Sequence, residues 1–314
     1  MRILIELPTW LGDVVMATPA IENLADYYNN PEITLIGSDI SIETLKNHPK
    51  VIKSLVFNKK YTSLFSMLKN LGEFDVFFSF RTSFRSRLLK LFISSINKYQ
   101  FNNNKFQNRH QVEKYNDFVN QALNTNYSAG KLKLALDNLV KDKSISFKKN
   151  SLTLGFSPGA TYGDSKRWYP QEFAEVGAKL SDRYKIIIFG SQDEKEIASD
   201  IEMALIEKGV TNYQNLAGNT SVEELMYHIS TLDMFVTGDT GPMHLAAAFQ
   251  VPTIAIFGPT KDNETSQWMN DKSTIVKKNL DCQPCMKRSC PLKHHNCMKH
   301  IKATEVLDAI KLLD

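Results

Sequence analysis

Four short segments hold residue types that suit an anionic ligand rich in hydroxyl groups. Each follows a short run of apolar and β-branched residues, so each is expected at a turn after a strand. Ligands of open parallel sheets bind outside the carboxyl ends of the strands. We therefore expect these turns to carry the chemistry. The segments are Leu11-Gly12-Asp13, residues 158–167, residues 190–194 and residues 238–244.

Asp13 is the first candidate for catalysis. It follows the apolar run 3–7, and a helical pattern begins at Val14. A carboxylate in this place can act as a general base, but Asp is also a preferred helix N-cap, and the spacing alone favours the cap. The turn lacks GxGxxG, which argues against an NAD-linked dehydrogenase.

The turn at 158–167 is suited to phosphate. Its small residues let the backbone approach an anion, Thr161 offers a hydroxyl, and Lys166 with Arg167 supplies positive charge. The alternative is a surface loop with incidental basic residues.

The turn at 238–244 opens an Ala-rich helix through Asp239, Thr240 and Gly241. The amides and dipole of a helix N-terminus favour a diphosphate there. Asp239 would repel phosphate, so we assign it to orienting the loop or to a sugar or ribose hydroxyl. His244 has two interpretations of equal weight, a donor to the ligand or a structural residue. The turn at 190–194 places Gln192, Asp193 and Glu194 where a ribose could be bound.

Basic residues dominate the segment from 79 to 114, where Glu113 is the single acid. Such a local excess suits an anionic partner, although a solvated helix and loop would show the same pattern. The basic residues are Arg81, Arg85, Arg87, Lys90, Lys98, Lys105, Arg109 and Lys114.

Length and composition predict the domains to which these segments belong. A chain of 314 residues suits two α/β domains, and we place them at 1–149 and 150–314, with a polar linker at 141–149. Apolar runs at 3–7, 33–36, 55–57 and 74–80, and again at 152–156, 185–189, 234–237 and 253–257, predict two doubly wound parallel sheets. Residues 303–313 predict an amphipathic helix.

The charge and hydropathy of the chain exclude several classes of protein. A net charge of +4 is too small for a dedicated nucleic-acid binder. No stretch reaches the roughly 18 apolar residues that cross a bilayer. Glu6, Pro8 and Asp13 interrupt the first apolar run, so we expect no signal peptide and a cytoplasmic protein.

All four cysteines lie close together in the chain, with His294, His295 and His300 among them. Their spacing matches no standard zinc finger or ribbon, so free thiols are favoured over a structural zinc site and over disulfides. The cysteines are Cys282, Cys285, Cys290 and Cys297.

Taken in order, these motifs resemble those of glycosyltransferase family nine, which contains the ADP-heptose:lipopolysaccharide heptosyltransferases. The resemblance covers residues 1 to about 301 and is nearest to the heptosyltransferase II branch. It rests on Leu11-Gly12-Asp13, Pro158-Gly159-Ala160 with Lys166-Arg167-Trp168, Gly238 to His244, and Phe257-Gly258-Pro259-Thr260.

The resemblance implies a GT-B fold, in which two Rossmann-like domains face a central cleft. It implies inverting transfer of heptose from ADP-heptose, held by the C-terminal domain, to an inner-core lipopolysaccharide acceptor, held by the N-terminal one. Asp13 would be the general base and Lys166 the lysine near the diphosphate. Donor-binding positions would be Thr161, Lys166, Glu194, Asp239, Thr240, Gly241 and His244, and acceptor-binding positions Arg81, Ser83 and Arg85.

The scheme needs no metal or other cofactor, and the lipid-linked acceptor implies work at the cytoplasmic face of the inner membrane. The alternatives are heptosyltransferase I or another transferase of the family, and a nucleotide-sugar-binding module without catalysis.

Overall fold

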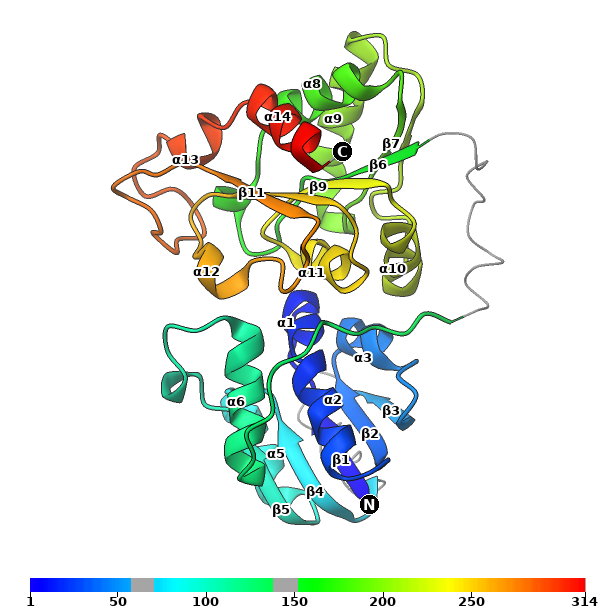
Figure 1. The fold of residues 1–314 in the computed structure, drawn as a ribbon, viewed down its shortest axis with the longest axis vertical. Helices are drawn as coiled ribbons and strands as arrows, with labels where there is room; N and C mark the ends of the chain where they lie inside the picture. Colours follow the sequence, from blue (N-terminus) through cyan, green and yellow to red (C-terminus); the bar gives the residue numbers. More distant parts are fainter. Residues whose placement is uncertain (58–70, 138–151, 314) are drawn as a thin grey trace. The chain divides into compact units, whose positions relative to one another are not determined.

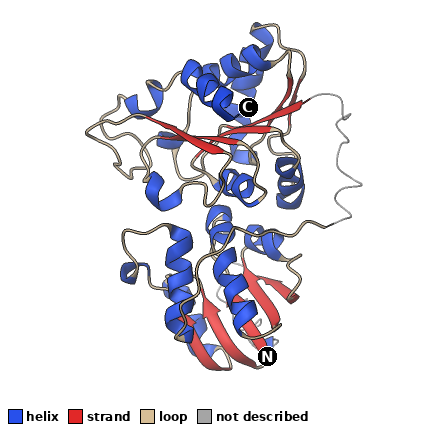
Figure 2. Cartoon of the chain, in the orientation of Figure 1, coloured by secondary structure: helices blue, strands red, loops and turns tan. Residues whose placement is uncertain are grey.

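The computed structural model of the chain describes residues 1–57, 71–137 and 152–313. The chain divides into two compact units, Met1–Asp137 and Asn138–Asp314. The expected domain boundary between residues 149 and 150, and the whole of the expected linker at 141–149, lie outside the described residues. Each unit has a parallel sheet flanked by helices (Figure 2).

The first unit contains a five-stranded parallel sheet in the order β3-β2-β1-β4-β5. Helices α2 and α6 pack together, and Phe118 of α6 contacts Phe78 on one face of the sheet. Helix α5 packs on the other face, where Leu89 joins Phe77 in a core cluster. The described elements are β1 (Arg2–Glu6), α1 (Leu11–Met16), α2 (Thr18–Tyr27), β2 (Glu32–Gly37), α3 (Asp39–Leu45), β3 (Val51–Val56), β4 (Phe74–Ser79), α5 (Phe84–Phe92), β5 (Ser95–Gln100), the 3-10 turn η1 (Asn103–Lys105) and α6 (Gln111–Leu123) (Figure 1).

The second unit contains a six-stranded parallel sheet in the order β11-β10-β9-β6-β7-β8. Apolar side chains of α8, α9 and α14 form one large core with this sheet, and α11 covers β9 and β10. Its elements are β6 (Leu152–Ser157), η2 (Asp164–Lys166), α8 (Pro170–Leu180), β7 (Tyr184–Ile188), η3 (Gln192–Glu194), α9 (Lys195–Glu207), β8 (Tyr213–Asn215), α10 (Val222–Ser230), β9 (Met234–Gly238), α11 (Gly241–Ala248), β10 (Thr253–Phe257), α12 (Asp262–Thr265), β11 (Ser273–Lys277), α13 (Asn296–Lys299) and α14 (Ala303–Leu313).

In both sheets the strand order reverses beside the first strand. The chain runs outward from β1 to β3 and resumes at β4 on the other side of β1; in the second unit it runs from β6 to β8 and resumes at β9. Ligands of doubly wound sheets bind at this switch point, outside the carboxyl ends of the two strands that flank it. The turns after β1 and β4, and after β6 and β9, therefore occupy the favoured positions.

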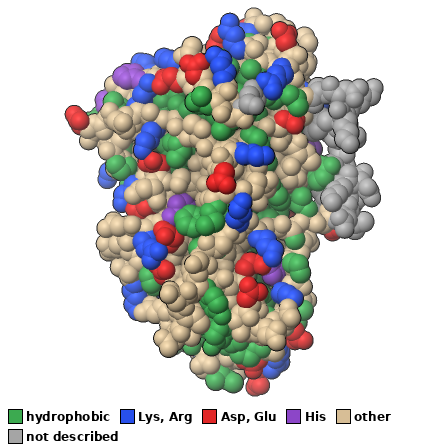
Figure 3. Space-filling model, viewed as in Figure 1, with side chains coloured by type: hydrophobic (Ala, Val, Ile, Leu, Met, Phe, Trp, Pro, Cys, Tyr) green, Lys and Arg blue, Asp and Glu red, His purple; other side chains and the backbone are tan. Residues whose placement is uncertain are grey.

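The surface is mixed in charge. On the face drawn in Figure 3, basic and acidic side chains are interspersed. No helix in the described ranges is both long enough and apolar enough to span a membrane.

Candidate functional site

The expected acceptor-side residues gather at the carboxyl ends of β1 and β4. Asp13 lies on α1, which follows β1, and Arg81 follows β4. Ser83 is the N-cap of α5, where its side chain accepts a hydrogen bond from the Ser86 N–H. The guanidinium group of Arg85 lies 3.9 Å from the centre of the Phe57 ring. The first sheet thus brings the predicted base and the predicted acceptor residues to one edge.

Asp13 is held by a residue that the sequence did not reveal. The N-cap of α1 is Trp10 and Asp13 lies in the first turn, so the interpretation of Asp13 as the cap is wrong. The Tyr115 hydroxyl, from α6, donates a hydrogen bond to Asp13 Oδ1 at 3.3 Å. Burial, followed by the negative charge of Asp13, raises the pKa of Tyr115 well above its usual value of 10. Tyr115 therefore keeps its proton and remains a donor to this carboxylate.

The two arginines that are predicted to bind the acceptor, Arg81 and Arg85, lie near a buried carboxylate, Glu6, at the end of β1. Glu6 is fully buried, and its two oxygens accept hydrogen bonds from Ser79 Oγ at 2.6 Å and Ser86 Oγ at 2.8 Å. Arg81 Nη1 lies 3.7 Å from Glu6 Oε1. Burial raises the pKa of Glu6, although the hydroxyls and the charges of Arg81 and Arg85 oppose that shift. Arg81 and Arg85 therefore favour the ionised form of Glu6, against the effect of its burial.

In the second unit, Lys166 joins the two predicted donor turns. Its ammonium group donates to Asp239 Oδ2 at 2.6 Å and to the Asp239 carbonyl at 2.9 Å. The Thr260 hydroxyl donates to the same Asp239 Oδ2 at 2.7 Å. Both charged side chains are largely buried, with 12% of Lys166 and 5% of Asp239 exposed. Of the two roles considered for Asp239, these contacts support the orientation of the loops.

The turn after β9 ends in a helix N-terminus. Thr240 is the N-cap of α11 without a side-chain cap bond, and Gly241 is the first helical residue. The first N–H groups of a helix lack partners within the helix, and the dipole makes this end attractive to anions. His244 is on the same helix but only 3% exposed. Its proposed contact with the donor stays a prediction.

Three residues in the turn after β7 are candidates for binding a ribose, and of these Glu194 lies against Gly159 in the loop 158–167. A Cβ atom added to Gly159 would fall 2.0 Å from the Glu194 Cδ, so a larger residue at this position would displace the Glu194 carboxylate. Gln192 instead donates to the Gly218 carbonyl, and Asp193 is exposed. Thr161 is also exposed, on the turn that precedes η2.

The segment 282–297, which contains the four cysteines, forms hydrogen bonds with the loop that carries Lys166. Ser165 donates from its N–H to the Arg288 carbonyl at 3.1 Å and from its hydroxyl to the Lys287 carbonyl at 2.6 Å. The Tyr162 hydroxyl donates to the Met286 carbonyl at 2.8 Å. The His295 ring Nε2 lies 2.9 Å from the Ser165 carbonyl oxygen. These contacts hold the loop that carries Lys166 against residues 286–295.

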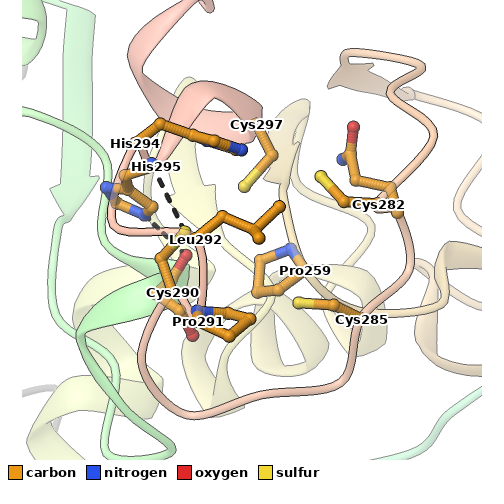
Figure 4. A pocket seen from close by; sticks show the side chains of 11 residues that line it. Pro259, Cys282, Cys285, Cys290, Pro291, Leu292, His294, His295 and Cys297 are labelled. Atoms are coloured by element: carbon orange, nitrogen blue, oxygen red, sulfur yellow. Dashed lines mark hydrogen bonds between the residues drawn. The ribbon is translucent and has the colours of Figure 1, made fainter.

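The four cysteines, none of which is in a disulfide, line one small pocket of the second unit (Figure 4). The volume available to the centre of a water molecule in this pocket is about 20 Å³, which is enough for about one water molecule. A hydrogen bond from the His295 backbone N–H to Cys290 Sγ lowers the pKa of Cys290, while burial raises the pKa of Cys297 to about 11. Within residues 1–57, 71–137 and 152–313, no three His, Cys, Asp or Glu side chains are arranged to hold a metal ion, so the zinc alternative gains no support.

Comparison with known proteins agrees with this arrangement. The family model for glycosyltransferase family 9 (heptosyltransferase) matches residues 71–296. A lipooligosaccharide heptosyltransferase 2 of Campylobacter jejuni is 38% identical over all of this chain and 98% of its own length. A lipooligosaccharide heptosyltransferase 2 of Haemophilus influenzae is 26% identical, with 88% of each chain covered. The chain therefore belongs to glycosyltransferase family 9.

The solved structures show the same fold. The Escherichia coli ADP-heptose lipopolysaccharide heptosyltransferase II structure matches 100% of this chain and 98% of its own, with a TM-score of 0.84 and 22% identity. That likeness, with the two parallel sheets described above, confirms the expected GT-B fold as a pair of Rossmann-like units.

Proposed function

We propose that this enzyme transfers heptose from ADP-L-glycero-β-D-manno-heptose to a heptose of the lipopolysaccharide inner core, with inversion at the anomeric carbon. Relatives that align with the whole chain are named heptosyltransferase 2, which supports this donor and acceptor. The observation that carries the proposal is the Lys166 ammonium held between two turns suited to a diphosphate.

Lys166 and the α11 N-terminus would bind the diphosphate of the donor. An ammonium group has three N–H donors, and Asp239 takes two of those of Lys166. Within the described residues, this leaves the third for a phosphate oxygen. Charge builds on the departing ADP during transfer, so a fixed cation beside it lowers the barrier to the reaction. Glu194, beside Gly159, is the candidate for the nucleoside hydroxyls.

Asp13 would remove the proton from the attacking acceptor hydroxyl. A positioned general base contributes typically about 10² to 10⁴ in rate. One displacement assisted by one base inverts the anomeric centre and needs no covalent intermediate. Arg81 and Arg85 would bind anionic groups of the acceptor, beside the cap made by Ser83. The acceptor is lipid-linked, so the enzyme would work at the cytoplasmic face of the inner membrane.

Two substitutions test these roles separately. Asp13→Asn should lower kcat strongly and leave the affinity for ADP unchanged, because the carboxylate acts on the acceptor. Lys166→Ala should lower both, because the ammonium meets phosphate in the ground state and in the transition state. Near-normal turnover of Asp13→Asn would refute the base, and unaltered ADP binding by Lys166→Ala in a calorimetric titration would remove Lys166 from the site.

The acceptor decides between this function and that of heptosyltransferase I. Purified enzyme should release ADP from ADP-heptose when the acceptor already carries a first heptose, and not when the acceptor lacks heptose. The opposite preference would assign the enzyme to the first transfer. Binding of ADP-heptose without sugar transfer to either acceptor would leave only a nucleotide-sugar-binding module.

A further inference from the structure

Helix α5 is apolar on two opposite faces. Its inward face carries Ser86 and Leu89, both buried against the sheet. At 100° per residue, Phe84, Leu88 and Leu91 fall on the outward face. Phe84 is 68% exposed and Leu91 is 71% exposed. A surface helix normally presents polar side chains to the solvent, so this second apolar stripe indicates an interaction surface.

Edge strand β5 extends the outward stripe. Lys98 of β5 donates from its ammonium group to the Leu91 carbonyl at 3.4 Å, which ties the strand to the end of the helix. Ile96 lies two residues before Lys98, hence on the same side of the strand, and is 81% exposed. Phe92 is also exposed. The α5 surface is defined here by Phe84, Leu88, Leu91, Phe92 and Ile96, with Arg87, Lys90 and Lys98 as its basic residues.

The chain segment that carries the α5 surface has charges of one sign. Residues 76–112 contain seven Lys and Arg and no Asp or Glu. Arg87 and Lys90 lie along one flank of the apolar stripe of α5, on the helical positions between the outward and inward faces. An apolar stripe beside basic side chains is the pattern of helices that lie in the interface of an anionic membrane.

We propose that the α5 surface docks the protein on an anionic lipid bilayer, with Phe84, Leu88 and Leu91 entering the boundary between headgroups and acyl chains. Arg87, Lys90 and Lys98 then meet the anionic headgroups. A two-fold dimer through this surface would bring the same basic residues of both copies together, and their repulsion favours the lipid as the occupant. The inference deepens the proposed function, on which it rests, because a lipid-linked acceptor lies in such a surface.

Sedimentation with vesicles tests the surface directly. The full chain should bind vesicles of equal parts phosphatidylglycerol and phosphatidylcholine, should bind pure phosphatidylcholine much less, and should be released by high salt. Phe84→Ser with Leu91→Ser should weaken binding by on the order of tenfold or more, since two apolar side chains lose their burial. Neutralising Arg87, Lys90 and Lys98 to Gln should weaken it on the order of 100-fold, from about fivefold per basic residue.

A matched control lies on α9 of the second unit. Met203 and Ile206 are 53% and 56% exposed there, so Met203→Ser with Ile206→Ser removes a similar apolar area from a different surface. This control should bind anionic vesicles as the unaltered chain does. Binding that survives the α5 substitutions, or that the control loses equally, would overturn the assignment.

Failure of the docking and failure of the proposed function give different results. With a deacylated, water-soluble acceptor, Phe84→Ser with Leu91→Ser should keep normal turnover, and it should lose turnover only on acceptor embedded in vesicles. Absence of turnover by the unaltered chain on every acceptor would refute the proposed function, but it would not change the result of the vesicle-binding experiment. Absence of vesicle binding by the unaltered chain would refute the docking. Self-association that the α5 substitutions abolish would assign the surface to a second copy instead.

Discussion

Tyr115→Phe is a sharp test of Asp13 as the proposed catalytic carboxylate, because the substitution removes one hydroxyl and little else. The hydroxyl donates to Asp13 Oδ1 at 3.3 Å, and the ring packs against Phe80 and Phe101 with centres 5.5 Å and 4.9 Å away. Phenylalanine keeps those ring contacts. We therefore expect the free energy of unfolding to change by about 1 kcal/mol or less.

The expected size of the effect follows from the geometry. A hydrogen bond to a charged group contributes about 1.5–3 kcal/mol, but 3.3 Å is longer than the usual O–H···O distance, so about 1 kcal/mol is appropriate for Asp13. The bond favours the ionised carboxylate. Its loss should therefore move the acid limb of the kcat/KM profile upward by about 0.7 pH unit and lower kcat/KM about fivefold below the plateau.

The assay is the pH dependence of ADP release at saturating donor and limiting acceptor. ADP affinity should not change, because Tyr115 lies in the first unit and Lys166 in the second. Tyr99→Phe is the matched control, since Tyr99 stacks on Phe78 with ring centres 5.0 Å apart. If Tyr115→Phe folds normally and its pH profile coincides with those of the control and of the unaltered enzyme, the hydroxyl does not position the base.

Three further predictions follow from hydrogen bonds and pKa shifts in the two units. Thr260→Val should weaken ADP binding about fivefold by calorimetry, because Asp239 loses one of its donors; equal affinity would remove Thr260 from the donor site. Glu6→Gln should unfold in urea at neutral pH no earlier than the unaltered chain. Because the pKa of Glu6 is raised in the folded state, its protonated carboxyl stabilises the fold fully below pH 4.5, and this stabilisation is lost as pH rises through the folded pKa. Any gain in stability to urea from Gln should therefore vanish on acidification. A gain that grew on acidification would contradict this reasoning. Iodoacetamide should modify Cys290, whose pKa is lowered, before Cys297, as mass spectrometry of the peptides can measure; equal protection of both would instead indicate a bound metal.

The sequence predicted the central strands of the fold and part of the edge strand β3, but it missed the edge strands β5, β8 and β11. Strands β1, β4, β6, β9 and β10 are nearly continuous apolar runs because both faces of a central parallel strand are buried. Strands β5 and β8 are edge strands with partly exposed, polar residues, and their sequences do not alternate clearly. No apolar run marks β5, which spans Ser95–Gln100. The helix expected at 303–313 is confirmed as α14.

Sequence reasoning placed the candidate residues in turns after strands, but it did not predict the residues that contact them. Asp13 and Lys166 lie in the segments that follow β1 and β6, and such a position can be recognised from the sequence alone. Tyr115 and Asp13 are 102 residues apart in the sequence, and no local sequence pattern predicts a contact between them. Glu6 was noted only as an interruption of an apolar run. Its burial becomes intelligible once β4 and α5 bring Ser79 and Ser86 to its two oxygens.

One helix connects the two proposals for the first unit. The N-terminal end of α5 carries the Ser83 cap and Arg85, beside the carboxylate that holds Arg81. Its outward face then continues in apolar side chains to Leu91. A lipid-linked acceptor has the same order, an anionic sugar region followed by acyl chains in the bilayer. Docking α5 along the membrane would therefore present the acceptor's charged groups to the arginines without lifting the lipid out, and turnover on membrane-embedded acceptor should depend on α5 more steeply than turnover on the deacylated form.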